Sequence, residues 1–231
     1  MLPSCFVTGT DTDVGKTIVT TAILRWWAKC GLHVAGMKPI ASGFTLRAGG
    51  YENHDIECIK AAANVKLPPQ LMNQYSYIPA IAPHIAAEQE GGSIDQQEIR
   101  RCFVEAQTLC DRIVVEGAGG WRVPLKMPNT DHTGSIITMG SLARQLRLPV
   151  VLVVGMRLGC INHALLSSEA ILSDGVKLAG WVANWIDPDF ESARENLVTL
   201  KRLLPAPLLF EVPFLDNEQT IRVFTPKKLV I

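Results

Sequence analysis

The chain has 231 residues, enough for a substantial core, and we expect residues 1–231 to form a single domain. Hydrophobic residues make up 48% and charged residues 19%, a composition typical of a folded chain and not of a disordered one. The 22 basic and 22 acidic side chains cancel, which argues against partners such as nucleic acid or an anionic membrane.

Six cysteines are scattered along the chain without a Cys-x-x-Cys pair, which argues against a zinc site and against a disulfide framework. The N-terminus shows no basic leader, and no apolar run is long enough to span a bilayer. We therefore expect a cytoplasmic protein.

The N-terminal segment carries the clearest motif. A β-favouring run, Cys5–Val7, leads into a loop bounded by Gly9 and Gly15, and a helical pattern begins at Lys16-Thr17. Backbone N–H groups of such a loop, and of the first turn of the helix, can surround an anion. Lys16 would reach the β- and γ-phosphates of a nucleotide, and the Thr17 hydroxyl would hold Mg²⁺. Five residues lie between the glycines, where the common motif has four.

The rest of the chain alternates strand and helix patterns. Apolar runs predict strands at 33–38, 112–116, 149–154, 178–184 and 208–210. Helical spacing predicts helices from 16 to about 30 and at 55–63, 85–90, 93–109, 136–147, 162–173 and 190–203. The pattern predicts an α/β fold with a mostly parallel sheet flanked by helices on both faces.

Other features qualify this assignment. Ser93 and Gln96 have the spacing of a capping box for the helix that starts there. Residues 41–53 read as a loop, and the glycines of 117–120 predict a break after their strand. Residues 122–134 and the tail after Asp216 show no clear pattern.

Polar residues recur where predicted strands end, and ligands of open parallel sheets bind at that edge. These positions are the 9–17 loop, Lys38, Glu116 with its glycines, residues 155–162 and Asn184. Together they predict a site for Mg²⁺ and a nucleoside triphosphate, with a second charged ligand nearby.

Three charged residues allow two interpretations each. Glu116, at the end of an apolar strand, is favoured as a Mg²⁺ ligand over an acid that simply meets solvent. Lys38 is favoured as a partner of a phosphoryl or carboxylate group over a solvated lysine. Asp55 alone is better explained as an acid in the first turn of a helix than as a second metal ligand.

The chain resembles the dethiobiotin synthetases, a P-loop NTPase-like family of biotin biosynthesis. Six segments carry the resemblance, in family order: 6–17 (FVTGTDTDVGKT), 36–43 (GMKPIASG), 114–121 (VVEGAGGW), 150–163 (VVLVVGMRLGCINH), 180–184 (GWVAN) and 205–213 (PAPLLFEVP). The five-residue gap in the phosphate loop is the form found in that family. Arg157 departs from the lysine of some members, and Ser141 from the aspartate of many.

The resemblance implies an enzyme, an ATP-dependent cyclo-ligase that uses Mg²⁺ as cofactor and ATP as co-substrate. It would convert 7,8-diaminononanoate and CO₂ into dethiobiotin through a carbamate and a carbamic-phosphoric anhydride, with release of ADP and phosphate. No covalent enzyme nucleophile is needed.

The resemblance also implies roles for individual residues. The catalytic residues would be Lys16, Lys38 and Thr12, and the Mg²⁺ ligands would be Thr17, Asp55 and Glu116, which reverses the interpretation of Asp55 from sequence alone. ATP would contact Asp13, Val14, Gly15, Lys16, Thr17, Glu116 and Gly119, with Asn184 and the segment ending at Pro213 around the adenine. Thr12, Lys38 and Ser42 would surround the diamine. A homodimer is implied, in which Gly159, Cys160 and Asn162 of the other subunit bind the substrate carboxylate.

Three alternatives remain beside this one. ParA/MinD-like nucleotide-switch ATPases carry a lysine five residues before the lysine of Gly-Lys-Thr, and here that residue is Asp11. The related domain of corrinoid amide ligases would normally be followed by a glutamine-amidotransferase domain, for which 231 residues leave no room. An inactive paralogue would retain the fold, although every proposed phosphate and metal residue is present.

Overall fold

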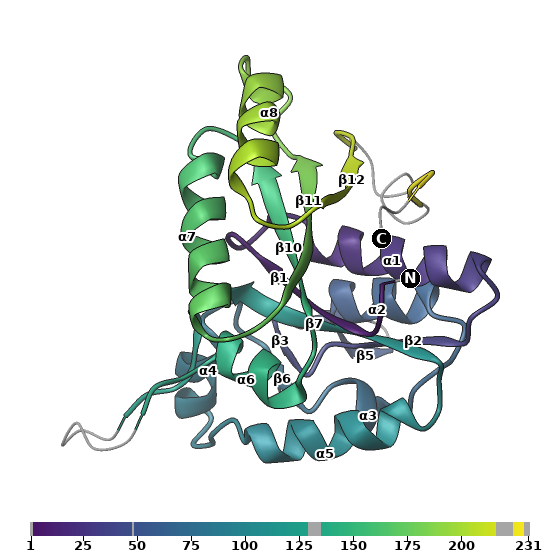
Figure 1. Ribbon diagram of the computed structural model, residues 1–231. Helices are drawn as coiled ribbons and strands as arrows, with labels where there is room; N and C mark the ends of the chain where they lie inside the picture. The colour runs from purple at the N-terminus through teal and green to yellow at the C-terminus, as the bar shows by residue number, and fades with distance from the viewer. Residues whose placement is uncertain (1, 48, 129–134, 216–223, 229–231) are drawn as a thin grey trace.

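The computed structural model describes residues 2–47, 49–128, 135–215 and 224–228. Its centre is a six-stranded sheet in the order β12-β11-β10-β1-β7-β2, in which every neighbouring pair is parallel (Figure 1). The strands are β1 (Cys5–Gly9), β2 (Val34–Met37), β7 (Arg112–Gly120), β10 (Val150–Met156), β11 (Leu178–Trp185) and β12 (Leu208–Val212).

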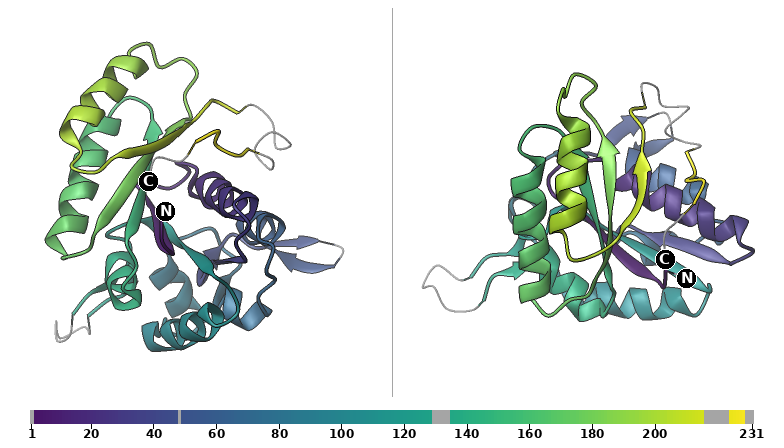
Figure 2. Two further views of the ribbon diagram at one scale, coloured as in Figure 1. Left: turned by 45° about the vertical axis from the view of Figure 1, so that its right-hand side comes forward. Right: turned by 45° about the horizontal axis from the view of Figure 1, so that its top comes forward.

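Helices cover both faces of this sheet (Figure 2). One face packs against α1 (Lys16–Lys29) and α2 (His54–Ala62). The other packs against α5 (Gln96–Gln107), α6 (Met139–Leu146), α7 (Cys160–Ser173) and α8 (Ala193–Leu203). The predicted α/β fold with a parallel sheet between two helical layers is therefore confirmed.

The strands are buried on both faces, which is why they read as unbroken apolar runs. Side chains of a strand alternate between the faces. In β10, Val151 and Val153 join the core beneath α1 and α2, whereas Leu152 and Val154 join the core on the opposite face.

Small elements complete the chain. They are β3 (Ile40–Ser42) paired with β6 (Tyr75–Tyr77), the hairpin of β4 (Thr45–Arg47) and β5 (Gly50–Glu52), β8 (Pro124–Lys126) paired with β9 (Ile137–Thr138), and the short helices α3 (Pro69–Met72) and α4 (Pro83–Gln89). The expected loop over 41–53 was wrong. The β4–β5 hairpin is almost entirely exposed, so it has no apolar alternation to reveal it.

The predicted break at 117–120 was also wrong, because β7 continues to Gly120. The pairing of β7 with β1 shifts register there: Val7 lies opposite Glu116, but Gly9 lies opposite Gly120. The extra residues bend the strand outward, as a β-bulge does. The glycines therefore shape the strand end and do not terminate it.

Two helix starts differ from the prediction. Asp95, not Ser93, caps α5, and its carboxylate accepts the Gln97 N–H at 2.8 Å. The helix predicted from 136 begins at Met139 after the strand β9, and Thr138 caps it. Ser141 completes a reciprocal capping box with Thr138, so the residue that departs from the family pattern serves the helix start.

The carboxyl end of β1 lies at the point where the order of the strands in the sheet reverses. From β1 the chain crosses to β2 and β7 on one side, and β10, β11 and β12 follow on the other. Ligands of open α/β sheets bind at such a point.

Among the described helices, none is both long enough and apolar enough to cross a bilayer. Of the predicted featureless segments, residues 129–134 and 216–223 lie outside the described residues.

Candidate active site

The phosphate loop lies between β1 and α1 and depends on one glycine. Gly15 has a φ of +86°, and a Cβ there would lie 2.0 Å from the side-chain nitrogen of Asn184. That amide donates a hydrogen bond of 2.9 Å to the backbone oxygen of Val14. Only glycine fits this backbone and this close approach. Asn184, at the end of β11, thus contacts the underside of the loop.

Lys16 is the first residue of α1 and is 8% exposed. Its Nζ lies 3.0 Å from the backbone oxygen of Asp11, so the ammonium extends across the loop. Burial and the positive charge of Lys38 lower the pKa of Lys16, against the opposing attraction of Glu116. An anion beside this ammonium would relieve the cost of its burial.

A buried cluster of charges joins the ends of β1, β2 and β7. Lys38 follows β2, and its Nζ lies 2.7 Å from Oδ2 of Asp55 and 2.6 Å from Oε1 of Glu116. The same Glu116 oxygen accepts the hydroxyl of Thr17 at 2.9 Å. Glu116 is 0% exposed and Lys38 4%. The sequence prediction that these strand ends meet is therefore confirmed for Thr17, Lys38 and Glu116, and Asp55 joins them from the first turn of α2.

The cluster shifts the pKa of Lys38 and that of Asp55. Burial by itself would lower the pKa of Lys38, but Glu116 and Asp55 outweigh it and raise the pKa to about 12. Burial by itself would raise the pKa of Asp55, but the charge and hydrogen bond of Lys38 keep it below the usual value. Lys38 is therefore a permanent positive charge at neutral pH and cannot act as a base there.

A cavity of about 720 Å³ opens over this cluster. Its walls include many of the predicted contacts of the phosphates, metal and diamine, listed here together: Thr12, Asp13, Gly15, Lys16, Thr17, Lys38, Ser42, Asp55 and Gly119. The buried hydroxyl of Ser42 has no hydrogen-bond partner among the described residues. A ligand in the cavity would supply one.

The residues present fit a magnesium ion. Oε2 of Glu116 is buried and has no partner within the described part of the chain. Thr17 and Asp55 bring a hydroxyl and a second carboxylate to the same cluster. Among the described residues, no group of three His, Cys, Asp or Glu side chains is placed to hold a metal ion without further ligands. Mg²⁺ is commonly held by one or two carboxylates, with phosphate and water filling the remaining positions.

A second cavity of about 530 Å³ lies at the ends of β11 and β12 and includes Pro213 in its wall. The guanidinium of Arg194 covers the ring of Trp185 at 4.5 Å, and both residues donate hydrogen bonds to Glu211, at 3.0 and 3.2 Å. Asn184 does not line this cavity. Asn184 instead contacts the phosphate loop through Val14. The adenine contact that the resemblance implies for Asn184 therefore stays a prediction.

Gly159, Cys160 and Asn162 lie at the start of α7, and none of them lines the cavity over the charge cluster. Asn162 is exposed, as is the preceding Leu158. These three predicted substrate contacts are therefore not part of the cavity wall in a single chain.

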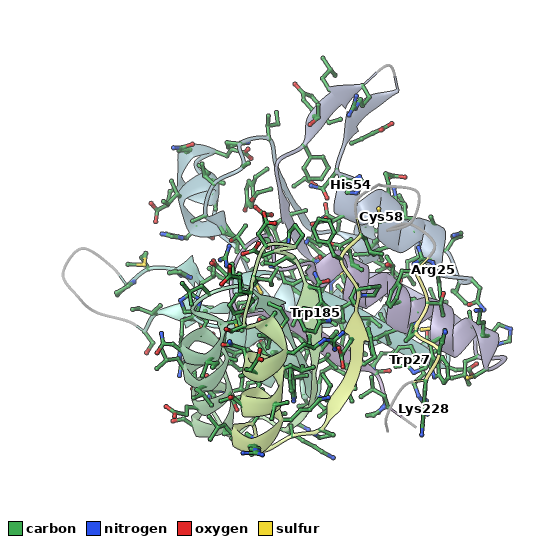
Figure 3. The ribbon with its side chains drawn as sticks, turned by 90° about the horizontal axis from the view of Figure 1, so that it is seen from above. Arg25, Trp27, His54, Cys58, Trp185 and Lys228 are labelled. Carbon is green, nitrogen blue, oxygen red and sulfur yellow. The ribbon has the colours of Figure 1, made fainter. Side chains whose placement is uncertain are left out.

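The structure adds site residues that sequence reasoning missed. Arg157 forms an ion pair of 2.5 Å with Asp11 of the phosphate loop, although 146 positions separate them and no spacing rule connects them. Arg25, His54 and Cys58 extend the wall of the 720 Å³ cavity along α1 and α2 (Figure 3). Only the helical spacing of His54 and Cys58, four residues apart, could have suggested that they share a face.

Comparisons with known proteins agree with the geometry. A family model described as an AAA domain matches residues 4–220. The ATP-dependent dethiobiotin synthetase BioD of Pseudomonas aeruginosa (strain UCBPP-PA14) is 46% identical over 217 residues, which cover 94% of this chain and 92% of the relative. The enzyme of the same name from Janthinobacterium sp. (strain Marseille) is 44% identical over 91% of this chain and 87% of its own length.

Solved structures show a shared fold. The MinC:MinD cell division protein complex and MinD alone, both from Aquifex aeolicus, align with TM-scores of 0.59 and 0.57 at 16% and 15% identity. Each alignment covers 95% of this chain and 85% of the other. This likeness is consistent with the nucleotide-switch alternative but does not favour it, because at such identity it concerns the fold alone. The close relatives decide the matter: the chain belongs to the family of ATP-dependent dethiobiotin synthetases.

Proposed function

We propose that residues 1–231 form one ATP-dependent domain that closes the ureido ring of dethiobiotin from 7,8-diaminononanoate and CO₂, with release of ADP and phosphate. The observation that carries the proposal is the cluster of Lys38, Asp55, Glu116 and Thr17 beside the phosphate loop, of which Thr17, Lys38 and Asp55 line one cavity. A cavity of this size suits a nucleotide's phosphates together with a small second substrate.

The reaction needs positioned charge more than a reactive side chain. One substrate amine takes up CO₂ and loses a proton to give a carbamate. A carbamate oxygen then forms a bond to the γ-phosphorus as the bond to ADP breaks. Finally the second amine forms a bond to the carbamate carbon, phosphate leaves with the bonding electrons, and the amine loses its proton. Each step develops or moves negative charge near the phosphates.

The charged residues of the cluster suit these steps. Lys38, held protonated by its two carboxylates, is a fixed positive charge for the carbamate. Lys16 would contact the β- and γ-phosphates. Thr12 and Ser42 would orient the carbamate and the diamine by hydrogen bonds. Positioning of two reactants in this way supplies much of the catalysis in phosphoryl transfer.

Thr17, Asp55 and Glu116 would hold Mg²⁺, with Oε2 of Glu116, which has no hydrogen-bond partner among the described residues, as one ligand atom. A bound Mg²⁺ neutralises charge on the phosphates and orients them for transfer. The phosphates would lie against Asp13, Val14, Gly15 and Gly119. The base would reach toward Asn184 and the cavity at Pro213, where Trp185 offers an aromatic surface.

A homodimer would complete the diamine site. Gly159, Cys160 and Asn162 do not line the cavity of their own chain, whereas Gly159 and Asn162 are exposed at the start of α7. The proposal places the substrate carboxylate on these residues of the partner subunit.

The proposed activity is tested with isotopically labelled bicarbonate. The protein is incubated with Mg²⁺, ATP, 7,8-diaminononanoate and the label, and the products are examined by mass spectrometry. We expect the label in a ring-closed urea with the mass of dethiobiotin. The same incubation with Lys38→Gln is the matched control, because it retains the phosphate loop but removes the charge meant for the carbamate. Absence of labelled product from the unaltered chain would contradict the proposal.

A further inference from the structure

An ion pair ties the phosphate loop to the loop that follows β10. Arg157 comes directly after β10, and its guanidinium lies 2.5 Å from Oδ2 of Asp11, two residues after β1. The two strands are adjacent, with Gly9 opposite Val153. Both loops therefore leave the same edge of the sheet side by side.

Asp11 uses three oxygens to shape the phosphate loop. Its Oδ1 accepts the backbone N–H of Thr12 at 2.8 Å, and its backbone oxygen accepts the ammonium of Lys16 at 3.0 Å. The remaining carboxylate oxygen is the one that Arg157 holds. The orientation of Asp11 thus sets the backbone at Thr12 and the resting position of Lys16.

We propose that Arg157 is a positioning residue: through Asp11 it holds the phosphate loop in the conformation that directs Thr12 and Lys16 toward the γ-phosphate. Arg157 itself lines neither of the two cavities described above. The inference rests on the proposed function, because the roles of Thr12 and Lys16 in phosphoryl transfer are part of that proposal.

The geometry suits a role in alignment better than one in folding. Arg157 and Asp11 are 42% and 45% exposed, and ion pairs of that exposure add little to global stability. Alignment is far more sensitive, because a displacement of about 1 Å in a reacting group can cost about 100-fold in rate. The backbone oxygen of Arg157 also accepts the N–H of Cys160 at 3.0 Å, which anchors its own backbone in the turn before α7.

The test compares Arg157→Gln, Arg157→Lys, Asp11→Asn and the double variant Arg157→Gln/Asp11→Asn. Arg101→Gln is the matched control: Arg101 forms an equally short pair, 2.6 Å, with Glu98 on α5. Binding of a non-hydrolysable ATP analogue is measured by calorimetry without the diamine. kcat and both KM values follow from steady-state kinetics, and the melting temperature from thermal unfolding.

We expect Arg157→Gln to weaken analogue binding and lower kcat/KM for ATP by about tenfold, the scale of a lost charge-assisted contact. The melting temperature and the KM for the diamine should match those of Arg101→Gln. Arg157→Lys should restore most of the loss, because it returns a positive charge to Asp11. The double variant should be no worse than Asp11→Asn, because Arg157 acts only through Asp11.

Two results would overturn the inference. Additive losses in the double variant would show that Arg157 acts independently of Asp11, and an Arg157→Gln protein that behaves like Arg101→Gln would show no positioning role. The calorimetric arm also separates this inference from the proposed function. If the unaltered protein binds the analogue but makes no dethiobiotin, the proposed function fails while the binding comparison still decides whether Arg157 holds the loop.

Discussion

At the scale of single residues, the site is governed by how one ammonium is shared between two carboxylates. Lys38 occupies one oxygen of Asp55 and one of Glu116, and it leaves Oε2 of Glu116 buried without a partner among the described residues. A cation beside that oxygen would give it the partner that it lacks. The magnesium proposal therefore depends most on Glu116.

Replacement of Glu116 by glutamine tests this dependence. The amide has the same shape but no charge, so we expect the Mg²⁺ concentration for half-maximal activity to rise at least tenfold, a loss of ~10-fold being usual even for residues that merely support a metal ligand. The measurement is a Mg²⁺ titration of turnover at saturating ATP. Glu98→Gln, which alters an exposed carboxylate on α5, is the control. An unchanged titration would remove Glu116 from the metal site.

The lowered pKa of Asp55 makes stability depend on pH in the acid range. Because the folded-state pKa lies below the unfolded value, the carboxylate stabilises the fold above the unfolded pKa, and this contribution is lost as the pH falls through the folded one. Asp55→Asn removes the contribution at every pH. We therefore expect the difference in unfolding free energy between the unaltered chain and the variant to shrink as the pH drops below ~4.

Urea unfolding at several pH values measures that difference. Glu169→Gln, an exposed carboxyl on α7, serves as the control. A gap between the unaltered chain and Asp55→Asn that stays constant from about pH 6 to about pH 3 would contradict the pairing of Asp55 with Lys38.

The sequence predicted correctly that Lys38 and Glu116 would lie close together, because both occupy positions at the ends of predicted strands. Lys38 and Glu116 each follow a recognisable apolar run. Asp55 was ambiguous because a first-turn acid needs no further explanation, and the structure shows that it is both a first-turn acid and a partner of Lys38. Arg157 and Asp11 pair through a register between β1 and β10 that exists only after the sheet has formed.

At the scale of elements, α6 shows how a local motif caps a helix start without an acidic residue in the first turn. Thr138 accepts the backbone N–H of Ser141 at 3.3 Å, and the Ser141 hydroxyl lies 2.7 Å from the backbone nitrogen of Thr138. Two otherwise unpaired N–H groups at the helix start are thereby satisfied.

The change Thr138→Ala should lower the free energy of unfolding by about 1 kcal/mol, because the cap loses its side-chain acceptor. Thr138→Ser keeps the hydroxyl and should stay close to the unaltered chain. Equilibrium urea unfolding, monitored by circular dichroism, compares the three proteins. Equal midpoints for Thr138→Ala and Thr138→Ser would show that the cap contributes nothing.

The predicted strands of the central sheet and the longer helices agree with the structure, because apolar runs and helical spacing report burial directly. The errors lie where burial gives no signal. The β4–β5 hairpin is exposed, and the extension of β7 through its glycines depends on a bulge against β1. The predicted helix from 136 placed β9 inside α6 because Ile137 continues the apolar pattern.

At the scale of the whole molecule, the predicted site divides into two parts. Most of the predicted phosphate, metal and diamine contacts meet at one cavity, and Pro213 lines the second, but Gly159, Cys160 and Asn162 line neither. Asn162 and Leu166, four residues apart, share one side of α7. Leu166 is an exposed apolar side chain, as is Leu158 just before the helix. This division is what the proposed homodimer explains.

The change Leu166→Glu should separate the proposed dimer, because it would place a charge in the interface. We expect light scattering to report a dimer for the unaltered chain and a monomer for the variant. The KM for the diamine should rise by about tenfold or more, the loss of a charge-assisted contact to its carboxylate. Binding of the ATP analogue should not change. An unaltered chain that is monomeric and fully active would contradict the shared site.

The proposed reaction requires that ATP turnover be coupled to the diamine. The decisive measurement is phosphate release from ATP, Mg²⁺ and bicarbonate, with and without 7,8-diaminononanoate, alongside quantification of dethiobiotin. We predict release that requires the diamine and matches product one for one. Slow release that is indifferent to the diamine would contradict the assigned reaction and would favour a nucleotide switch on the same fold.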